Sequence, residues 1–239
     1  MEIVLYLAMT AAEFRENGHR FPKIAWMACH FSPYGTGLSN LPAKLPKGSL
    51  LMVNDRTPVS GHEPERIAGQ LKEVVEELQC CGIALDFQRA NEPQTQRIAT
   101  AVAALPFPVA VTPQYAHGLS CAVLLPPIPM TTLPEDYLLP WKGRDIWLEV
   151  AAECRVIRVT PEGSQEMEEQ DHSFPCPHLD ERLHCQYGMD IHAAHVDFHL
   201  RREKSHLEHL MQDMASLGVS HFVGLYQQLR QSFCQPKEE

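Results

Sequence analysis

The feature that most constrains the fold is a regular alternation of short apolar segments and amphipathic segments between residues 49 and 113. The pattern predicts strands and helices in the order Ser49–Asn54 (strand), Pro64–Gln79 (helix), Gly82–Gln88 (strand), Gln94–Leu105 (helix) and Val109–Pro113 (strand). Consecutive strands separated by helices must run parallel, with right-handed crossovers. This part of the chain therefore predicts an α/β fold with a parallel sheet.

Further strand-like segments lie on both sides of this run: Ile3–Ala8, Ile24–Phe31, Cys121–Leu125, Ile146–Ala151, Arg155–Thr160, Ala194–Leu200 and His221–Tyr226. A helical pattern at Lys204–Leu217 separates the last two. We therefore expect residues 194–226 to form a second parallel strand–helix–strand unit.

The number and order of these segments favour one domain over residues 1–239. We expect an α/β fold, an irregular (β/α)8 TIM-like barrel in which loops replace some helices, with an irregular hairpin and loop insertion at about residues 141–190. The hairpin would turn at Pro161-Glu162-Gly163. A doubly wound open sheet is the alternative, but no glycine-rich phosphate-binding turn follows any predicted strand, so no cofactor is expected.

The formal net charge is −10, and no cluster of Lys and Arg interrupts the acidic balance. Nucleic acid and membrane surfaces are therefore not expected as partners. The first nine residues form a short apolar run with no basic leader, which predicts a strand rather than a signal peptide or a membrane span. Together with eight dispersed cysteines, this favours a cytoplasmic protein with reduced thiols. The sequence does not indicate an oligomeric state.

The strand predicted at residues 82–88 has two different faces. Because side chains alternate along a strand, Ile83, Leu85 and Phe87 share an apolar face that suits covering helices. The opposite face carries Asp86 and Gln88 at the end of the strand. Barrel enzymes place their chemistry at this end, so Asp86 is the candidate catalytic residue. A carboxylate held by backbone amides or by a neighbouring arginine is the structural alternative.

Polar and aromatic side chains follow the ends of other predicted strands as well. If the strands are parallel, these ends meet at one rim of the barrel. The candidate ligand-binding residues at this rim are His30, Tyr34, Asn54, Asp55, Gln88, Gln114, Tyr115, Tyr226 and Gln227. Amide, carboxylate and aromatic groups with little positive charge suit a neutral, polyhydroxylated ligand such as a carbohydrate. A phosphate ligand would require more basic side chains or glycine-rich amide nests.

The octapeptide Cys81-Gly82-Ile83-Ala84-Leu85-Asp86-Phe87-Gln88 resembles the motif Asp-Gly-x-Asp-x-Asp-x-Glu of the family-18 glycoside hydrolases, which are chitinase-like barrels. The glycine and the last aspartate agree, whereas Cys81 and Ala84 replace two carboxylates and Gln88 replaces the catalytic glutamate. The last strand resembles that family's closing strand, with Tyr226 in place of an aromatic residue that is usually tryptophan. The resemblance implies the barrel fold and a carbohydrate site.

A glutamine amide holds no proton for a leaving glycosidic oxygen. The sequence therefore favours a catalytically silent, glycoside-hydrolase-like barrel that binds a carbohydrate or a small polar ligand. One alternative is an active glycoside hydrolase that uses Asp86 with Asp55. Another is a metal-binding module that uses Cys176, His178, His184 and Cys185, or the strand face with His195, Asp197 and His199. Neither set has the spacing of a known zinc motif, so no metal site is assigned.

Overall fold

The computed structural model describes residues 3–89, 92–168 and 174–233. Two compact units are distinguished by their internal contacts. The first contains the chain up to Pro126 together with Trp141–Glu149 and Gly218–Gln227. The second contains Pro127–Pro140, Val150–Leu217 and the described residues after Gln227.

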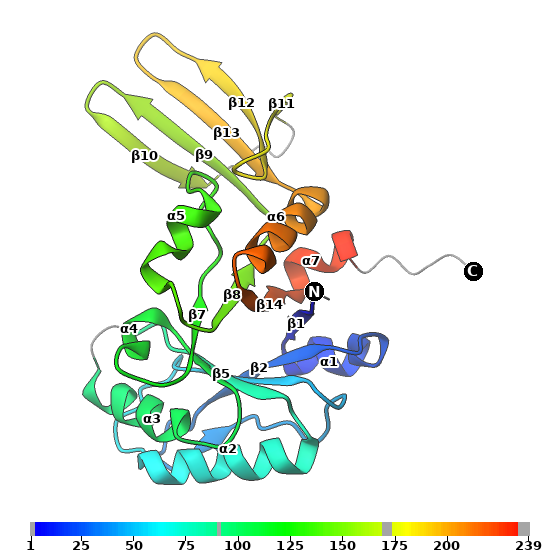
Figure 1. Ribbon diagram of the computed structural model, residues 1–239, viewed down its shortest axis with the longest axis vertical. Helices are drawn as coiled ribbons and strands as arrows, with labels where there is room; N and C mark the ends of the chain where they lie inside the picture. The colour runs from blue at the N-terminus through cyan, green and yellow to red at the C-terminus, as the bar shows by residue number, and fades with distance from the viewer. Residues whose placement is uncertain (1–2, 90–91, 169–173, 234–239) are drawn as a thin grey trace. The chain divides into compact units, whose positions relative to one another are not determined.

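The first unit is built around a closed barrel of eight strands (Figure 1). In the order of their pairing around the barrel these are β1 (Leu5–Met9), β14 (Val219–Leu225), β8 (Ile146–Val150), β7 (Ala122–Leu125), β6 (Val109–Val111), β5 (Gly82–Asp86), β4 (Leu50–Asn54) and β2 (Ile24–Phe31). Parallel pairing of β1 with β2 closes the ring, and the short strand β3 (Leu38–Ser39) extends β2. The predicted TIM-like barrel is confirmed.

The barrel interior is narrow and contains small side chains beside a few large ones. Five of its buried residues are alanines, and the large Trp147 is fully buried among them. The interior cluster consists of Tyr6, Ala8, Ala25, Leu50, Met52, Ala84, Ala110, Ala122, Leu124, Trp147 and Val223. Because side chains alternate, the presence of Ala84 here places Asp86 on the same inward-facing side of β5, as predicted.

The covering helices are unequal, which makes the barrel irregular. Helices α2 (Pro64–Leu78) and α3 (Pro93–Ala103) agree with the predicted helices, and with the four-residue α4 (Pro113–Ala116) they lie side by side outside the strands (Figure 1). A short helix, α1 (Ala11–Asn17), connects β1 to β2 and has a capping box formed by Thr10 and Glu13. The loop and strand β3 take the place of a helix between β2 and β4.

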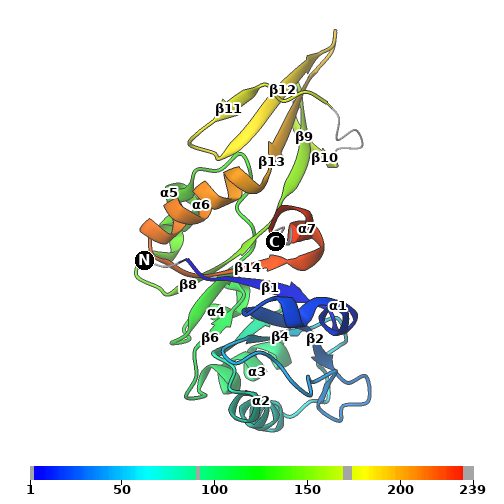
Figure 2. The same cartoon turned by 90° about the vertical axis from the view of Figure 1, so that its right-hand side faces the viewer.

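The second unit contains a five-stranded antiparallel sheet in the order β10 (Gly163–Glu168), β9 (Glu153–Thr160), β13 (Val196–Arg202), β12 (Cys185–Ile191) and β11 (His178–Asp180). The turn between β9 and β10 falls at the predicted position. Helices α5 (Pro134–Leu138) and α6 (Lys204–Ser216) lie beside each other in this unit (Figure 2), and a 3-10 turn spans Leu139–Trp141. Among the described residues the last helix is α7 (Tyr226–Phe233), whose first two residues belong to the first unit.

The predicted second parallel unit over residues 194–226 is wrong. Strand β13 pairs antiparallel with β9 and β12, whereas β14 closes the barrel beside β1. The helix between them was predicted correctly, but its two flanking strands belong to different sheets. A strand–helix–strand pattern shows the order of elements, and it cannot show which strands pair.

Two general expectations concern thiols and membranes. The seven cysteines within the described ranges are all free thiols. Over the same residues, no helix combines the length and the apolar character needed to cross a bilayer.

Candidate functional site

Asp86 and Gln88 come together at the carboxyl end of β5. The Gln88 side-chain amide donates a hydrogen bond to the Asp86 carboxylate. Burial raises the pKa of Asp86, the hydrogen bond from Gln88 opposes this rise, and the nearby Asp55 adds to it. The apolar face opposite these two residues is fully buried, as the sequence predicts. Asp86 is therefore a partly buried carboxylate whose nearest polar partner is an amide that cannot protonate a ligand.

Asp55 holds the backbone that follows β5. It is only 2% exposed, and its two carboxylate oxygens accept hydrogen bonds from the backbone amides of Gln88 and Arg89 at 2.9 and 2.8 Å. The Arg89 guanidinium in turn donates to the Asp55 carbonyl at 2.8 Å. The carboxylate held by backbone amides that the sequence analysis considered for Asp86 is thus found at Asp55. Asp55 orients the loop that carries Gln88.

Asn54 stabilises an irregularity in the neighbouring strand. The pairing of β2 with β4 shifts register between Trp26 and Cys29. The Asn54 side-chain amide donates to the carbonyl of Met27, within this irregular stretch, and to that of Cys29 at its end, at 3.1 and 3.0 Å. Its oxygen accepts from the Arg56 amide at 3.2 Å. Asn54 thus shapes the rim through contacts with the backbone.

Gln114 and Tyr115, both on α4, support the loop that follows β5. Gln114 donates to the Phe87 carbonyl, and Thr112 donates to it as well, at 3.0 Å. Tyr115 is buried, packs edge-to-face on Phe87, and donates its hydroxyl proton to the Arg89 carbonyl. These side chains fix the polypeptide beneath the site.

The other predicted rim residues are dispersed. Tyr34 is 85% exposed on the loop after β2, and the His30 ring lies 3.0 Å from the Ala28 carbonyl. Tyr226 begins helix α7 and packs against Phe21, and Gln227 is exposed on the same helix. In β14 the inward-facing position after Val223 is Leu225, which is 42% exposed. Tyr226, which the resemblance identifies with an aromatic floor residue, therefore lies one position after the inward-facing residue Leu225.

Glu149 is a candidate site residue that the sequence analysis missed. It lies on β8 two residues after the inward-facing Trp147, so it faces the same side. Burial raises the pKa of Glu149 to about 8, and the negative charge of Asp86 contributes to this rise. Glu149 therefore holds a proton at neutral pH. The signal was available in the sequence, because alternation within the predicted strand 146–151 pairs Glu149 with Trp147.

Three different groups thus occur at the inward-facing ends of the strands. Asp86 accepts hydrogen bonds, the Gln88 amide both donates and accepts them, and protonated Glu149 donates. Leu225 adds exposed apolar surface. The set suits hydroxyl and amide groups of a neutral ligand, and a carboxylic acid beside a carboxylate is also the pairing used in acid–base catalysis.

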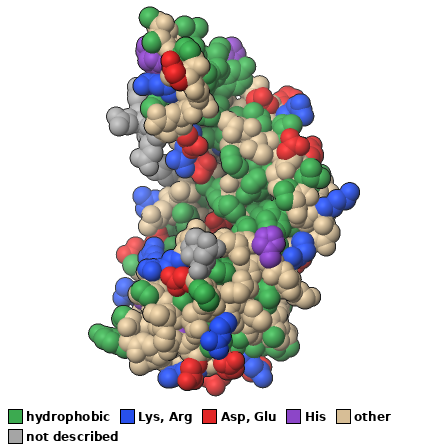
Figure 3. Space-filling model, turned by 90° about the vertical axis from the view of Figure 1, so that its left-hand side faces the viewer, with side chains coloured by type: hydrophobic (Ala, Val, Ile, Leu, Met, Phe, Trp, Pro, Cys, Tyr) green, Lys and Arg blue, Asp and Glu red, His purple; other side chains and the backbone are tan. Residues whose placement is uncertain are grey.

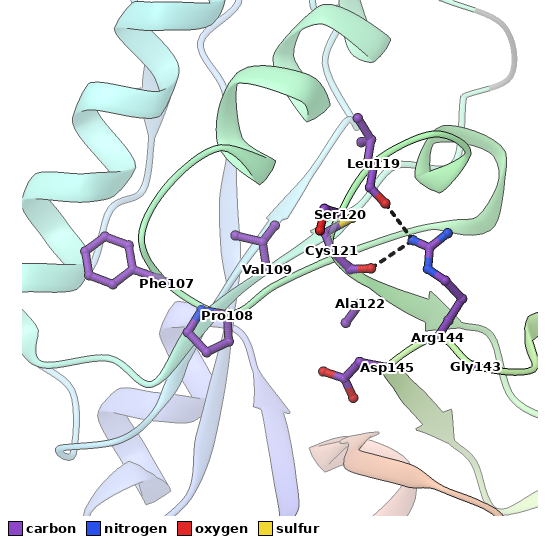
Figure 4. A pocket seen from close by; sticks show the side chains of 10 residues that line it. All are labelled: Phe107, Pro108, Val109, Leu119, Ser120, Cys121, Ala122, Gly143, Arg144 and Asp145. Carbon is purple, nitrogen blue, oxygen red and sulfur yellow. Dashed lines mark hydrogen bonds between the residues drawn. The ribbon is translucent and has the colours of Figure 1, made fainter.

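The hollow shown in Figure 4 lies at the other end of the strands. Its volume is about 630 Å³, and its lining residues precede or begin strands β6, β7 and β8. Arg144 crosses it to donate hydrogen bonds to the carbonyls of Leu119 and Cys121, at 3.0 and 2.8 Å (Figure 4). In barrels this amino-terminal end serves stability rather than chemistry. We therefore assign no ligand to this hollow.

The four residues considered as metal ligands do not form a ligand set. The Cys185 thiol is buried and donates to the Met130 carbonyl, and Cys176 donates to the His199 carbonyl. His178 is exposed beside Tyr187.

Acidic and basic side chains are interspersed over the face shown in Figure 3. The sequence likewise contains no cluster of Lys and Arg.

A closed parallel barrel with carboxyl groups at the carboxyl ends of its strands defines the class of fold: an α/β barrel of the TIM type. No protein-family model and no curated protein sequence matches the chain. Solved structures do match. The chitinase from Chromobacterium violaceum has a TM-score of 0.57 and 9% identity, over 98% of this chain and 100% of that one.

Two further structures resemble the chain at the same level of identity, 9%. The spore cortex-lytic enzyme SleL of Bacillus cereus has a TM-score of 0.55, over 93% of this chain and 70% of that one. A putative sporulation-specific glycosylase, ydhD of Bacillus subtilis, has a TM-score of 0.52, over 84% and 90%. At this identity the likeness shows the fold, and the predicted resemblance to chitinase-like barrels is confirmed at that level.

Proposed function

We propose that the barrel binds a neutral carbohydrate, or a small ligand of similar polarity, at the carboxyl end of its strands, and that it does not hydrolyse it through residue 88. The observation that carries the proposal is the Gln88 amide hydrogen-bonded to Asp86. A chitinase-like barrel would have its proton donor at this position, and the amide retains the binding groups of that donor without a transferable proton.

The environment of Gln88 supports binding. The loop is held by Asp55 and by Tyr115, so Gln88 and Asp86 are oriented before a ligand arrives. Pre-orientation reduces the entropy lost on binding. The structural neighbours are described as a chitinase, a spore cortex-lytic enzyme and a glycosylase, which supports carbohydrate as the ligand class.

The test is calorimetric titration of the full chain with chitin oligosaccharides, with cello-oligosaccharides as a second series. Because one neutral hydrogen bond contributes about 0.5–1.5 kcal/mol, we expect Gln88→Ala to weaken binding about three- to tenfold. Gln165→Ala, at an exposed position of β10, is the matched control and should leave the affinity unchanged. Equal affinities for the wild type and Gln88→Ala would contradict the proposed site.

A second candidate is a glycoside hydrolase in which Glu149 supplies the proton and Asp86 acts as the carboxylate. The specific observation in its favour is the pKa of Glu149, about 8, which leaves the acid protonated at neutral pH. Glu149 replaces Asp55 in this scheme, because both oxygens of Asp55 already bind backbone amides. Asp55 acts as a positioning residue in either scheme.

Hydrolysis of aryl glycosides separates the two candidates. The silent barrel predicts no turnover by the wild type, and Gln88→Glu would restore the missing acid. The hydrolase predicts turnover that falls about 10²–10⁴-fold in Glu149→Gln, since that is the usual contribution of a general acid. Wild-type turnover that disappears in Glu149→Gln and is unchanged in Gln88→Ala would establish the second candidate.

A further inference from the structure

A cluster of imidazole and carboxylate groups lies at the turn between β12 and β13, within the second unit. The last paired residues of this hairpin are Ile191 and Val196, and the His192 amide donates to the His195 carbonyl at 2.9 Å. His192 and His195 therefore stand opposite each other on either side of Ala193 and Ala194. Their rings are stacked, with 4.4 Å between centroids.

Two aspartates lie on the same face of the hairpin. Asp190 and Asp197 are directly opposite in the register, two residues before His192 and two residues after His195. His192 Nε2 is 3.2 Å from the Asp190 carboxylate, and His195 Nε2 is 3.7 Å from that of Asp197. Strand alternation thus gathers two imidazoles and two carboxylates on one side of the turn.

A single arginine lies against the two aspartates of this face. Like charges directly opposite in an antiparallel pair are unfavourable. Arg158, opposite Asp197 on β9, donates two hydrogen bonds to its carboxylate at 2.9 and 2.7 Å. One guanidinium thus faces the two carboxylates of this pair, and it is held by Asp197. A bound cation would add a positive charge between them.

We propose that this hairpin binds a divalent transition-metal ion, with His192, His195 and Asp197 as its ligands. Their candidate ligand atoms, two imidazole nitrogens and one carboxylate oxygen, lie within 4.8 Å of one another. Among the described residues, these three form the group of His, Cys, Asp or Glu side chains whose positions could hold a metal ion. Ligand atoms around a tetrahedral zinc ion lie about 3.4 Å apart, so small side-chain rotations complete the site.

The two imidazole ligands favour zinc, nickel or copper over calcium or magnesium. Arg158 occupies one lone pair on each oxygen of Asp197 and leaves the others available, so it fixes the carboxylate as an outer-sphere partner would. Three protein ligands leave the remaining coordination positions to water. The site is independent of the carbohydrate site proposed for the barrel.

The test is titration of the full chain with ZnCl₂, after removal of any polyhistidine tag, in competition with a chromophoric chelator. We expect one equivalent of zinc to bind, and the association constant to fall about tenfold or more in His192→Ala and in His195→Ala. His209→Ala is the control, because His209 lines a different hollow of the same unit together with His184 and His206. This variant should bind zinc as the wild type does.

Cobalt substitution provides a second measurement. The visible absorption bands of bound Co²⁺ should weaken in His195→Ala, and the urea midpoint of this variant should stay at the wild-type value because Arg158 and Asp197 remain paired. The proposal is overturned if no stoichiometric zinc binds. It is also overturned if His209→Ala loses zinc while His195→Ala retains it.

Discussion

The Asp55 carboxylate accepts a hydrogen bond from the backbone amide of Gln88, with 2.9 Å between Oδ1 and the amide nitrogen. Its other oxygen accepts from the Arg89 amide at 2.8 Å. The path of the chain after β5, where Gln88 lies, therefore depends on the buried Asp55 carboxylate, which follows the neighbouring strand β4. The polar site and its support come from different strands of the barrel.

Replacing Asp55 by asparagine should destabilise the fold. One of the two oxygens becomes an amide that cannot accept, so a backbone N–H loses a charged partner, which costs about 1.5–3 kcal/mol. Urea unfolding measures the loss, and Glu77→Gln, an exposed charge removal on α2, should stay within about 0.5 kcal/mol of the wild type. Equal unfolding free energies for Asp55→Asn and Glu77→Gln would refute this role.

Gly82→Ala should be destabilising although it adds a single methyl group. A Cβ at Gly82 would lie 2.7 Å from the Pro108 carbonyl oxygen and 2.9 Å from the Trp147 ring, so strand and ring must move. Overpacking of this kind costs about 1–3 kcal/mol. Gly69 on α2 is the matched control, since a Cβ there meets nothing within 4 Å and alanine favours helix by about 1 kcal/mol. The two variants should shift the melting temperature in opposite directions.

The strands and helices of the barrel could be predicted because their signals are local, and their closure into a barrel was implied by the resemblance to chitinase-like proteins. The spacing of apolar positions predicted the two faces of β5, and it predicted the bounds of α2 and α3 to within a few residues. The partners of β13 depend instead on contacts between distant segments, and its own pattern is compatible with either sheet. Local periodicity identifies elements, whereas pairing is decided by packing.

The candidate site was predicted in part for the same reason. Asp86 and Gln88 were found because they share one strand. Glu149 was not predicted because the candidate residues lie at or after the strand ends, whereas Glu149 lies within β8. Tyr226 was predicted at the rim from its place after the last strand; it begins α7, and alternation from Val223 puts Leu225 at the inward-facing position. Burial and the charge of Asp86, which determine the protonation of Glu149, come only from the assembled barrel.

Arg202 should be essential to the stability of the second unit. Its buried guanidinium donates to the carbonyls of Ile128, Leu183 and His184, at 2.8, 2.9 and 3.2 Å. Arg202→Met leaves these acceptors without a partner, at about 1–3 kcal/mol for each that water does not reach. We expect a loss of at least about 2 kcal/mol in urea unfolding. The exposed Arg182, changed to methionine as a control, should alter stability little, and equal losses in both variants would contradict this assignment.

Glu149 should make stability depend on pH, and the direction follows from its raised pKa. Its pKa is about 8 in the folded protein against 4.5 for an unperturbed glutamate. The unfolded chain therefore releases this proton first, so the contribution of Glu149 to stability is fully present below pH 4.5 and is lost as the pH rises to about 8. The loss amounts to a few kcal/mol, since one pKa unit corresponds to about 1.4 kcal/mol.

Glu149→Gln removes this titration and retains the shape of the side chain. We expect the variant to gain stability over the wild type as the pH rises from 4.5 to 8, and to keep a constant difference above that range. Urea unfolding at pH 4.5, 6, 7 and 8.5 measures the difference, with Glu77→Gln as the control whose difference from the wild type stays flat. A difference for Glu149→Gln that does not change with pH would show that Glu149 ionises normally in the folded barrel, and the proton assigned to it at the proposed ligand site would then be absent at neutral pH.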